Sequence, residues 1–108
     1  MSLYADYLKD SGLRHIIETD AGFITYEIHG NVCYAVDMYI KPEFRRQGTA
    51  RQLMNQVVDL ALNNNCKWVS TTINTLIKDP TRSMQGLITY GFKITRSEAN
   101  CIYLVKEL

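Results

Sequence analysis

The feature that most constrains the fold is an amphipathic helical pattern at residues 48–63, which stands between strand patterns at residues 33–40 and 67–73. Apolar side chains recur along one stripe of this helix, and polar side chains occupy the opposite side. The stripe consists of Leu53, Met54, Val57, Val58, Ala61 and Leu62. A strand, a helix and a strand in sequence favour parallel pairing and a right-handed connection. The sequence therefore predicts a β-α-β unit whose helix packs on a sheet.

Further elements on both sides of this unit complete the predicted sheet. They are expected at residues 4–8 (helix), 14–19 and 23–28 (strands), 80–90 (helix), and 92–96 and 101–105 (a hairpin). Asp79 followed by Pro80 is typical of an N-cap and the first helical position. The chain has 108 residues, 46% of them hydrophobic, which is enough for a single core. We therefore expect one domain over residues 1–108.

Composition and charge exclude several classes of protein. The formal net charge of +1 gives no global field that would recruit nucleic acid or a membrane. No apolar run approaches the roughly 18 residues that span a bilayer, and residues 1–10 lack the apolar region of a signal peptide. Cys33, Cys66 and Cys101 form no C-x-x-C pair, which disfavours a metal site. Free thiols without a secretion signal favour a cytoplasmic protein.

Residues 40–51 form the segment that carries chemistry, because a strand there passes through Pro42 and an arginine-rich turn into the long helix. The first turn of a helix presents unpaired N–H groups and about half a unit of positive charge. Gly48 has no Cβ to keep an anion away, and Arg45, Arg46 and Arg51 add positive charge. These residues predict a phosphate-bearing ligand. The alternative is a glycine that eases a turn beside solvated arginines.

The same segment resembles the coenzyme A signature of the GNAT superfamily of N-acetyltransferases. That signature has Arg or Gln, two residues, Gly, one residue, then Gly or Ala, supplied here by Arg45, Gly48 and Ala50. The approach through residues 40–44 and the later Gly91-Phe92 pair also resemble the family. The resemblance implies an α/β (α+β) fold with a mixed, mainly antiparallel sheet, splayed central strands and helices on both faces. It describes a small, N-terminally abbreviated member.

The resemblance implies acetyl-CoA as the acetyl donor and a primary amine that attacks the thioester directly. Backbone groups at the end of the strand would hold the pantetheine arm, and N–H groups of the following turn would hold the pyrophosphate. The expected coenzyme-binding residues are Met38, Tyr39, Ile40, Arg45, Arg46, Gln47, Gly48, Thr49, Ala50, Arg51 and Asn74. Asn74 would replace an asparagine that relatives carry nearby, although a turn role is the alternative.

Candidates for proton transfer are less clear than those for binding. Leu87 stands where many relatives have a tyrosine that protonates the leaving thiolate, and Tyr90 points to a different helix face, which favours packing. Asp37 and Tyr34 are the candidate catalytic residues, on the strand before the signature. A buried Asp37 would have a raised pKa suited to a base, and the alternative is a satisfied Asp on the open face of the sheet.

The remaining polar residues and the short N-terminus concern the acceptor. Glu27 and His29 could line an acceptor site or be solvated strand residues, and His15 has no evident partner. Few residues precede the first strand, so we expect an acceptor cleft that is open or completed by another chain. An exposed edge of the final hairpin could pair with a second copy and form a homodimer.

Two other functions compete with acetyl transfer. One is a coenzyme A-binding module without efficient catalysis, which Leu87 and the short N-terminus favour. The other is a nucleic-acid binder that uses Arg45, Arg46 and Arg51; the low net charge and the lack of a stacking aromatic platform disfavour it.

Overall fold

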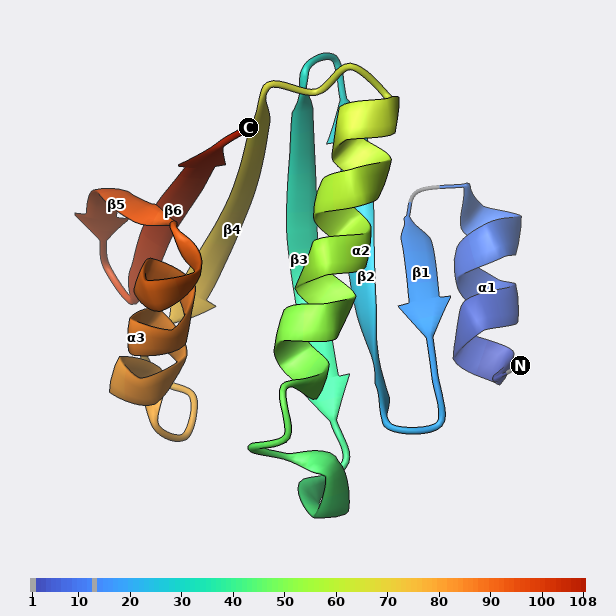
Figure 1. Cartoon of the computed structure of the whole chain (residues 1–108), viewed down its shortest axis with the longest axis horizontal. Helices are drawn as coiled ribbons and strands as arrows, with labels where there is room; N and C mark the ends of the chain where they lie inside the picture. The colour runs from blue at the N-terminus through green and yellow to red at the C-terminus, as the bar shows by residue number, and fades with distance from the viewer. Residues whose placement is uncertain (1, 13) are drawn as a thin grey trace.

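The computed structural model describes residues 2–12 and 14–108. In this part of the chain a six-stranded sheet carries three α-helices and one 3-10 turn (Figure 1). In chain order these are α1 (Leu3–Ser11), β1 (His15–Glu18), β2 (Gly22–His29), β3 (Val32–Ile40), η1 (Pro42–Phe44), α2 (Thr49–Asn63), β4 (Trp68–Asn74), α3 (Pro80–Tyr90), β5 (Lys93–Glu98) and β6 (Cys101–Glu107). The predicted order of elements is confirmed.

The sheet is mixed, and its strand order is β1-β2-β3-β4-β6-β5. β3 and β4 pair in parallel, as expected for two strands joined through α2, and every other neighbouring pair is antiparallel. β1 and β5 are the edges, and all six residues of β5 are exposed. The predicted mixed, mainly antiparallel sheet is therefore confirmed.

β3 and β4 separate partway along their length. They pair from Val32 and Trp68 to Ala35 and Thr71, and no further pair joins them after that point. Figure 1 shows β4 leaning away from β3 beyond the paired part. The predicted splay of the central strands is present. It leaves the β4-facing backbone edge of residues 36–40 without a strand partner.

A β-bulge between β2 and β3 explains why β3 diverges from β4. Tyr26 pairs with Ala35 and Ile24 with Met38, so Val36 and Asp37 on β3 together face the single residue Thr25 on β2. The fully buried Thr25 hydroxyl accepts a hydrogen bond from the Asp37 backbone N–H at 3.0 Å. An extra residue of this kind bends its strand and increases the local twist. The bulge therefore determines the direction in which the last residues of β3 run toward α2.

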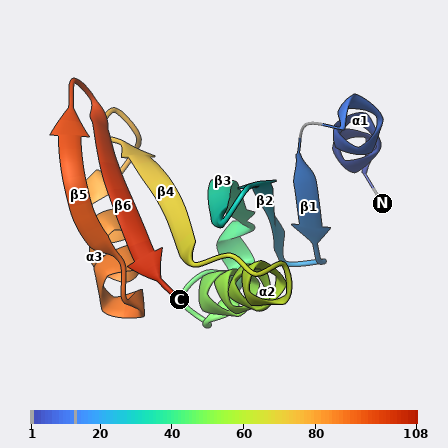
Figure 2. The ribbon, with the colours of Figure 1, turned by 90° about the horizontal axis from the view of Figure 1, so that it is seen from above.

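Helices cover both faces of the sheet. α2 and α3 pack on one face and share its core, whereas α1 lies on the other side next to β1 (Figure 2). The core residues are Ile24, Tyr26, Cys33, Ala35, Leu53, Met54, Val57, Ala61, Cys66, Val69, Ile73, Phe92 and Leu104. Leu62 does not join them, contrary to the predicted stripe, because it lies at the stripe's margin in the last turn of α2 and is 51% exposed.

The residues that cap the helices are of the expected types. In α1 the Ser2 hydroxyl accepts from the Ala5 N–H, and Gly12 closes the helix in the left-handed region with a φ of 67°. At the end of α2 the left-handed residue is Asn65, with a φ of 61°. No helix in the described ranges has the length and apolarity needed to cross a bilayer.

Candidate functional site

The turn between β3 and α2 is held in place by its own side chains. Arg45 Nε donates to the Ile40 carbonyl at 2.9 Å, and Gln47 Nε2 donates to the Glu43 carbonyl at 3.0 Å. Thr49 Oγ1 donates to the Phe44 carbonyl at 3.3 Å. These side-chain bonds use backbone carbonyls as acceptors and do not occupy the N–H groups of residues 46–51.

The N–H groups of residues 46–51 form the open part of this turn. None of them donates to an acceptor in the described part of the protein, and Gly48 gives α2 no side-chain cap. Arg46 and Gly48 both lie in the left-handed region, with φ of 63° and 80°. Such turns at a helix N-terminus orient N–H dipoles into a concave anion site. The cradle for a phosphate group stays a prediction, and these backbone conformations are compatible with it.

Gly48 is required here for its backbone conformation. A Cβ built at this position would meet no heavy atom within 4 Å, so crowding within the protein does not select glycine. A φ of 80° is strained for residues with a side chain. The space beside Gly48 is open to a ligand.

Arg45, Arg46 and Arg51 lie in and beside this turn. The Arg45 guanidinium lies 5.8 Å from the centre of the Tyr39 ring, and that of Arg51 lies 5.3 Å from the centre of the Tyr90 ring. Neither these two nor Arg46 forms an ion pair with any carboxylate among the residues described. Their positive charge is therefore available to an anion at the start of α2.

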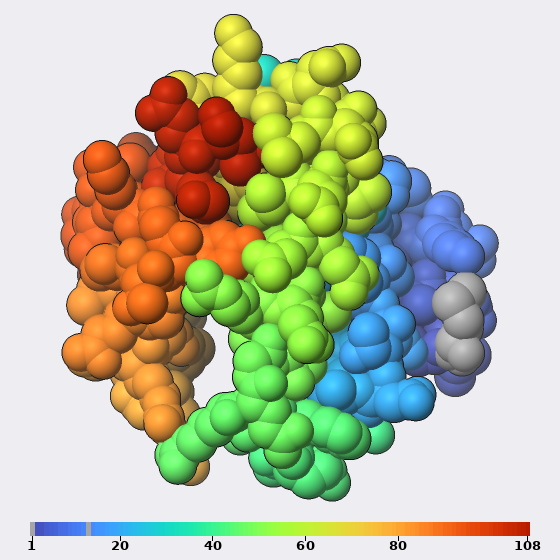
Figure 3. Space-filling model, in the orientation of Figure 1, coloured from blue at the N-terminus to red at the C-terminus, as the bar shows by residue number. Residues whose placement is uncertain are grey.

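The mouth of this site lies between two separate parts of the chain. Figure 3 shows an opening between the start of α2, in green, and α3, in orange. Met38, Tyr39 and Ile40 lie on the β3 side of the strand divergence, and Asn74 ends β4 on the other side. The predicted coenzyme residues are thus brought to one region. The Ile40 carbonyl already accepts a hydrogen bond from Arg45 Nε.

The face of the sheet opposite α2 carries a charged cluster. Arg14 Nε lies 2.8 Å from Glu27 Oε2, and Arg14 Nη1 lies 3.5 Å from Asp37 Oδ2. His29 Nε2 lies 2.9 Å from Glu27 Oε1. The hydrogen bond with His29, followed by that with Arg14, lowers the pKa of Glu27. Glu27 and His29 therefore contact each other, with the His29 side chain 63% exposed and that of Glu27 24% exposed.

Asp37 corrects the expectation of a buried base. Its side chain is 55% exposed, because the bulge turns it toward Arg14 on the open face. The interpretation of a buried carboxylate is wrong, and the alternative of a satisfied Asp on the open face describes the structure. Tyr34 also lies on this face, half-exposed, with its ring in edge contact with His29.

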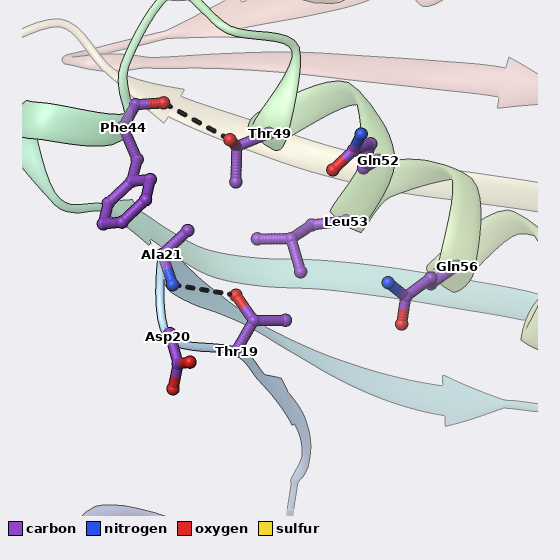
Figure 4. A pocket seen from close by; sticks show the side chains of 8 residues that line it. All are labelled: Thr19, Asp20, Ala21, Phe44, Thr49, Gln52, Leu53 and Gln56. Carbon is purple, nitrogen blue, oxygen red and sulfur yellow. Dashed lines mark hydrogen bonds between the residues drawn. The ribbon is translucent and has the colours of Figure 1, made fainter.

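A groove of about 390 Å³ adjoins this cluster. It is lined by Tyr34, Ala35, Val36, Ser70, Thr71, Thr72, Thr95, Arg96 and Tyr103. A second hollow, of about 400 Å³, lies between the β1–β2 turn and the first half of α2 (Figure 4). Figure 4 shows the Thr19 hydroxyl bound to the Ala21 N–H in that turn, and the Thr49 hydroxyl bound to the Phe44 carbonyl.

The cysteines take no part in either site. Cys33 and Cys66 are buried, Cys101 is half-buried, and all three are free. Burial raises the pKa of Cys33 to about 11, so this thiol stays protonated at neutral pH. No group of three or more His, Cys, Asp or Glu side chains is placed to hold a metal ion among the residues described.

Comparison with known proteins decides the family. A model of the acetyltransferase (GNAT) family matches residues 2–77, which is most of the chain. The chain belongs to the GNAT acetyltransferase family. No curated protein sequence matches it. The coenzyme A signature proposed from the residues lies inside the matched range.

Solved structures share this GNAT fold at low sequence identity. A PaiA N-acetyltransferase from Thermoplasma acidophilum, in complex with coenzyme A, has a TM-score of 0.79 and 17% identity over 98% of this chain and 69% of that one. Ard1 from Thermoplasma volcanium has a TM-score of 0.71 and 21% identity over 82% of this chain and 63% of that one. A GNAT family acetyltransferase from Elizabethkingia anophelis, with acetyl-CoA bound, has a TM-score of 0.74 and 18% identity over 99% of this chain and 86% of that one.

In this GNAT chain α3 offers no side chain for protonating a thiolate at the expected place. Leu87 packs against the core. The Tyr90 hydroxyl donates to Asn55 Oδ1 at 2.6 Å, and burial raises the pKa of Tyr90. Tyr90 therefore ties α3 to α2, in agreement with the packing interpretation. Asn74 Oδ1 accepts from the Leu76 N–H at 2.9 Å, which is the turn role considered as its alternative.

Two residues of the site were missed by sequence reasoning. Arg14 joins Glu27 and Asp37, which lie 13 and 23 residues away in sequence, so no local spacing could have revealed it. Arg96 lines the groove from an edge strand and has no motif around it. His15, which had no expected partner, stacks on Tyr26 with 5.1 Å between ring centres.

Proposed function

We propose that this chain is an N-acetyltransferase that moves the acetyl group of acetyl-CoA to a primary amine by direct attack. The observation that carries the proposal is the divergence of β3 and β4 toward a turn whose N–H groups at residues 46–51 are uncommitted. Membership of the GNAT acetyltransferase family supports it. We further propose that residues 1–108 act as one coenzyme-binding domain in the cytoplasm.

In this proposal the coenzyme follows the order of the exposed backbone groups. The pyrophosphate binds the N–H groups of residues 46–51, where the α2 dipole and the unpaired arginines stabilise its charge. The pantetheine arm runs along the unpaired edge of residues 38–40, with Asn74 on the opposite side of the opening. The acetyl group then lies where β3 and β4 separate.

The amine approaches from the face opposite α2, where the groove lies. Its nitrogen forms a bond with the thioester carbonyl carbon, and the C–S bond breaks. We propose that Asp37 accepts the proton lost by the amine, with Tyr34 as the second candidate. Leu87 cannot supply a proton, so solvent protonates the leaving thiolate. Catalysis then rests mainly on positioning the two substrates and stabilising the oxyanion through backbone N–H groups.

Thiol release from acetyl-CoA across a broad panel of amines tests the function. We expect release that depends on at least one amine, with an acetylated product of matching mass. Binding of acetyl-CoA in calorimetry without turnover across the panel would favour the second candidate, a coenzyme A-binding module, which the position of Leu87 supports. Absence of binding would contradict both.

The role of Asp37 has its own test. Asp37→Asn should lower turnover by about tenfold or more while leaving the acetyl-CoA affinity unchanged, because general base catalysis contributes about 10²–10⁴-fold. Asp10→Asn, an equal charge change on the exposed side of α1, is the matched control. An equal loss of turnover and affinity would make Asp37 structural.

A further inference from the structure

We propose that the acceptor amine carries an anionic group, a carboxylate or a phosphate, that Arg96 binds in the groove opposite α2. This inference rests on the proposed acetyl transfer and names the class of its acceptor. The groove is lined by several hydroxyl-bearing side chains and by one charged side chain, Arg96. The proposal rests on the position of Arg96 relative to the point where β3 and β4 separate.

Strand register places three groove residues in one row. Thr72 on β4 faces Tyr103 on β6, and Tyr103 faces Arg96 on β5. Directly paired residues on antiparallel strands share a face of the sheet. The last pair between β3 and β4 is Ala35 with Thr71, so the row begins one residue beyond the point of divergence. It leads from the proposed acetyl position to Arg96.

Arg96 is held ready for an anion. Its guanidinium lies 4.2 Å from the centre of the Tyr103 ring, which fixes it over an aromatic face. Among the residues described it forms no ion pair and donates no hydrogen bond. A planar guanidinium with free N–H donors binds carboxylate or phosphate through two parallel hydrogen bonds.

The hydroxyls of the groove separate into two groups. Those of Ser70, Thr71 and Thr95 are used by the protein itself, since they donate to the carbonyls of Leu104, Ala35 and Tyr103. Those of Tyr34, Thr72 and Tyr103 form no hydrogen bond within the described ranges. These three hydroxyls can bind polar groups of an acceptor along the path to Arg96.

The charged cluster beside the groove has the opposite charge, and its His29 contacts Tyr34 of the groove and Glu27 of the cluster. Asp37 and Glu27 carry two negative charges, and Arg14 between them carries one positive charge, which leaves an excess of one negative charge. An amine arriving as its ammonium form is attracted to this cluster, and an anion to Arg96. β4 and β5 are two strand spacings apart, about 10 Å, and Arg96 leans back over Tyr103. The acceptor's two charged groups should therefore lie about 5–10 Å apart.

Acceptors of matched chain length test this inference. The panel consists of δ-aminovalerate and ε-aminocaproate, an aminoalkyl phosphate of similar length, n-hexylamine without an anion, and cadaverine with a second cation. We expect kcat/KM to be at least about tenfold higher for the anionic acceptors than for n-hexylamine, because hydrogen bonds between charged groups contribute about 1.5–3 kcal/mol. Comparing the carboxylate acceptors with the phosphate acceptor shows which anion is preferred.

Variants of Arg96 connect the preference to this residue. Arg96→Gln should remove the preference, and Arg96→Glu should reverse it in favour of cadaverine. Lys67→Gln removes the same charge at an exposed position outside the groove and should leave the preference intact. Unfolding midpoints of all three variants check that the fold is retained. A preference that survives Arg96→Gln, or the absence of any preference in the wild type, would overturn the inference.

A binding measurement separates this inference from the proposed function. Calorimetry of the coenzyme A-loaded protein with ε-aminocaproate needs no turnover. Binding that weakens about tenfold in Arg96→Gln supports the anion site even if no amine is acetylated, and in that case acetyl transfer alone fails. Acetylation of n-hexylamine and ε-aminocaproate at equal rates, with no Arg96-dependent binding, refutes the anion site alone.

Discussion

Two connections lead from a strand to a helix, β3 to α2 and β4 to α3, and they begin on strands that separate from each other. They differ in how the N-terminus of the helix is capped. At α3 the Asp79 carboxylate accepts from the Arg82 N–H at 3.3 Å, and Pro80 has no N–H to satisfy. At α2 Gly48 offers no side chain, and the N–H groups of residues 46–51 are open. α3 therefore has its own anion at its N-terminus, whereas α2 has none there.

Both cap residues adopt the left-handed conformation, for different reasons. Gly48 has a φ of 80° and Asp79 a φ of 55°. Glycine reaches this region without steric cost, and a short polar side chain tolerates it through local hydrogen bonds. The conformation of the two caps is therefore similar, and the side chain decides which helix start can bind an anion.

The largest expected effect comes from converting the open start into a closed one. Gly48→Glu places a carboxylate beside the open N–H groups and forces a side chain into a φ of 80°. Repulsion between charges at short range costs several kcal/mol, so we expect the acetyl-CoA affinity to fall by about hundredfold or more in calorimetry.

Gly30→Glu is the matched control for that variant. Gly30 also has a positive φ, 61°, and a Cβ there would likewise meet nothing within 4 Å. It lies in the turn between β2 and β3, at the opposite end of β3 from Gly48. We expect Gly30→Glu to bind acetyl-CoA like the wild type. Equal losses in both variants would show that backbone strain, and not the anion site, is responsible.

The next effect concerns the bulge that directs β3 toward the open start. Thr25→Val removes the acceptor of the Asp37 N–H in a fully buried position, which should lower the free energy of unfolding by about 1–3 kcal/mol. Thr71→Val is the comparison, because its hydroxyl donates to the Ala35 carbonyl where β3 and β4 are still paired. Denaturant unfolding measures both. An equal or larger loss in Thr71→Val would contradict a special role for the bulge.

A smaller effect is expected at the capped start. Asp79→Ala removes the cap of α3 and should cost about 1 kcal/mol in unfolding free energy, with the acetyl-CoA affinity unchanged. Asp79→Gly also removes the carboxylate but accepts the φ of 55°, so its loss should be smaller. A large loss of acetyl-CoA affinity in either variant would mean that both helix starts bind the coenzyme.

The smallest effect is a gain in stability within α3. Gly86 is exposed, and a Cβ there would meet nothing within 4 Å. Gly86→Ala should therefore raise the free energy of unfolding by about 0.5–1 kcal/mol, which thermal unfolding can detect as a higher midpoint. Coenzyme affinity should stay the same. A weaker affinity would indicate that α3 must flex when the ligand enters.

Much of the fold could be predicted because the signals are local. The apolar stripe of α2, the Asp79-Pro80 start of α3 and the apolar residues of β3 each act within a few positions of the chain. The prediction of a phosphate cradle also rests on local signals, since Gly48 and the arginines beside it are neighbours in sequence.

The opposite face of the sheet could not be predicted because its contacts are distant in sequence. Arg14, Glu27 and Asp37 meet only after β1, β2 and β3 have paired, and the bulge that exposes Asp37 depends on Thr25 across the strand. Arg96 reaches the groove through the register of β5 with β6.

The most direct test of the difference between the two helix starts is a titration of nitrogen-labelled protein with coenzyme A, followed through its backbone amide NMR signals. We expect large shifts for residues 46–51, whose N–H groups have no acceptor among residues 2–12 and 14–108. The amide of Arg82, which is already bound to Asp79, should shift little. Equal shifts at both helix starts, or none at residues 46–51, would contradict the account.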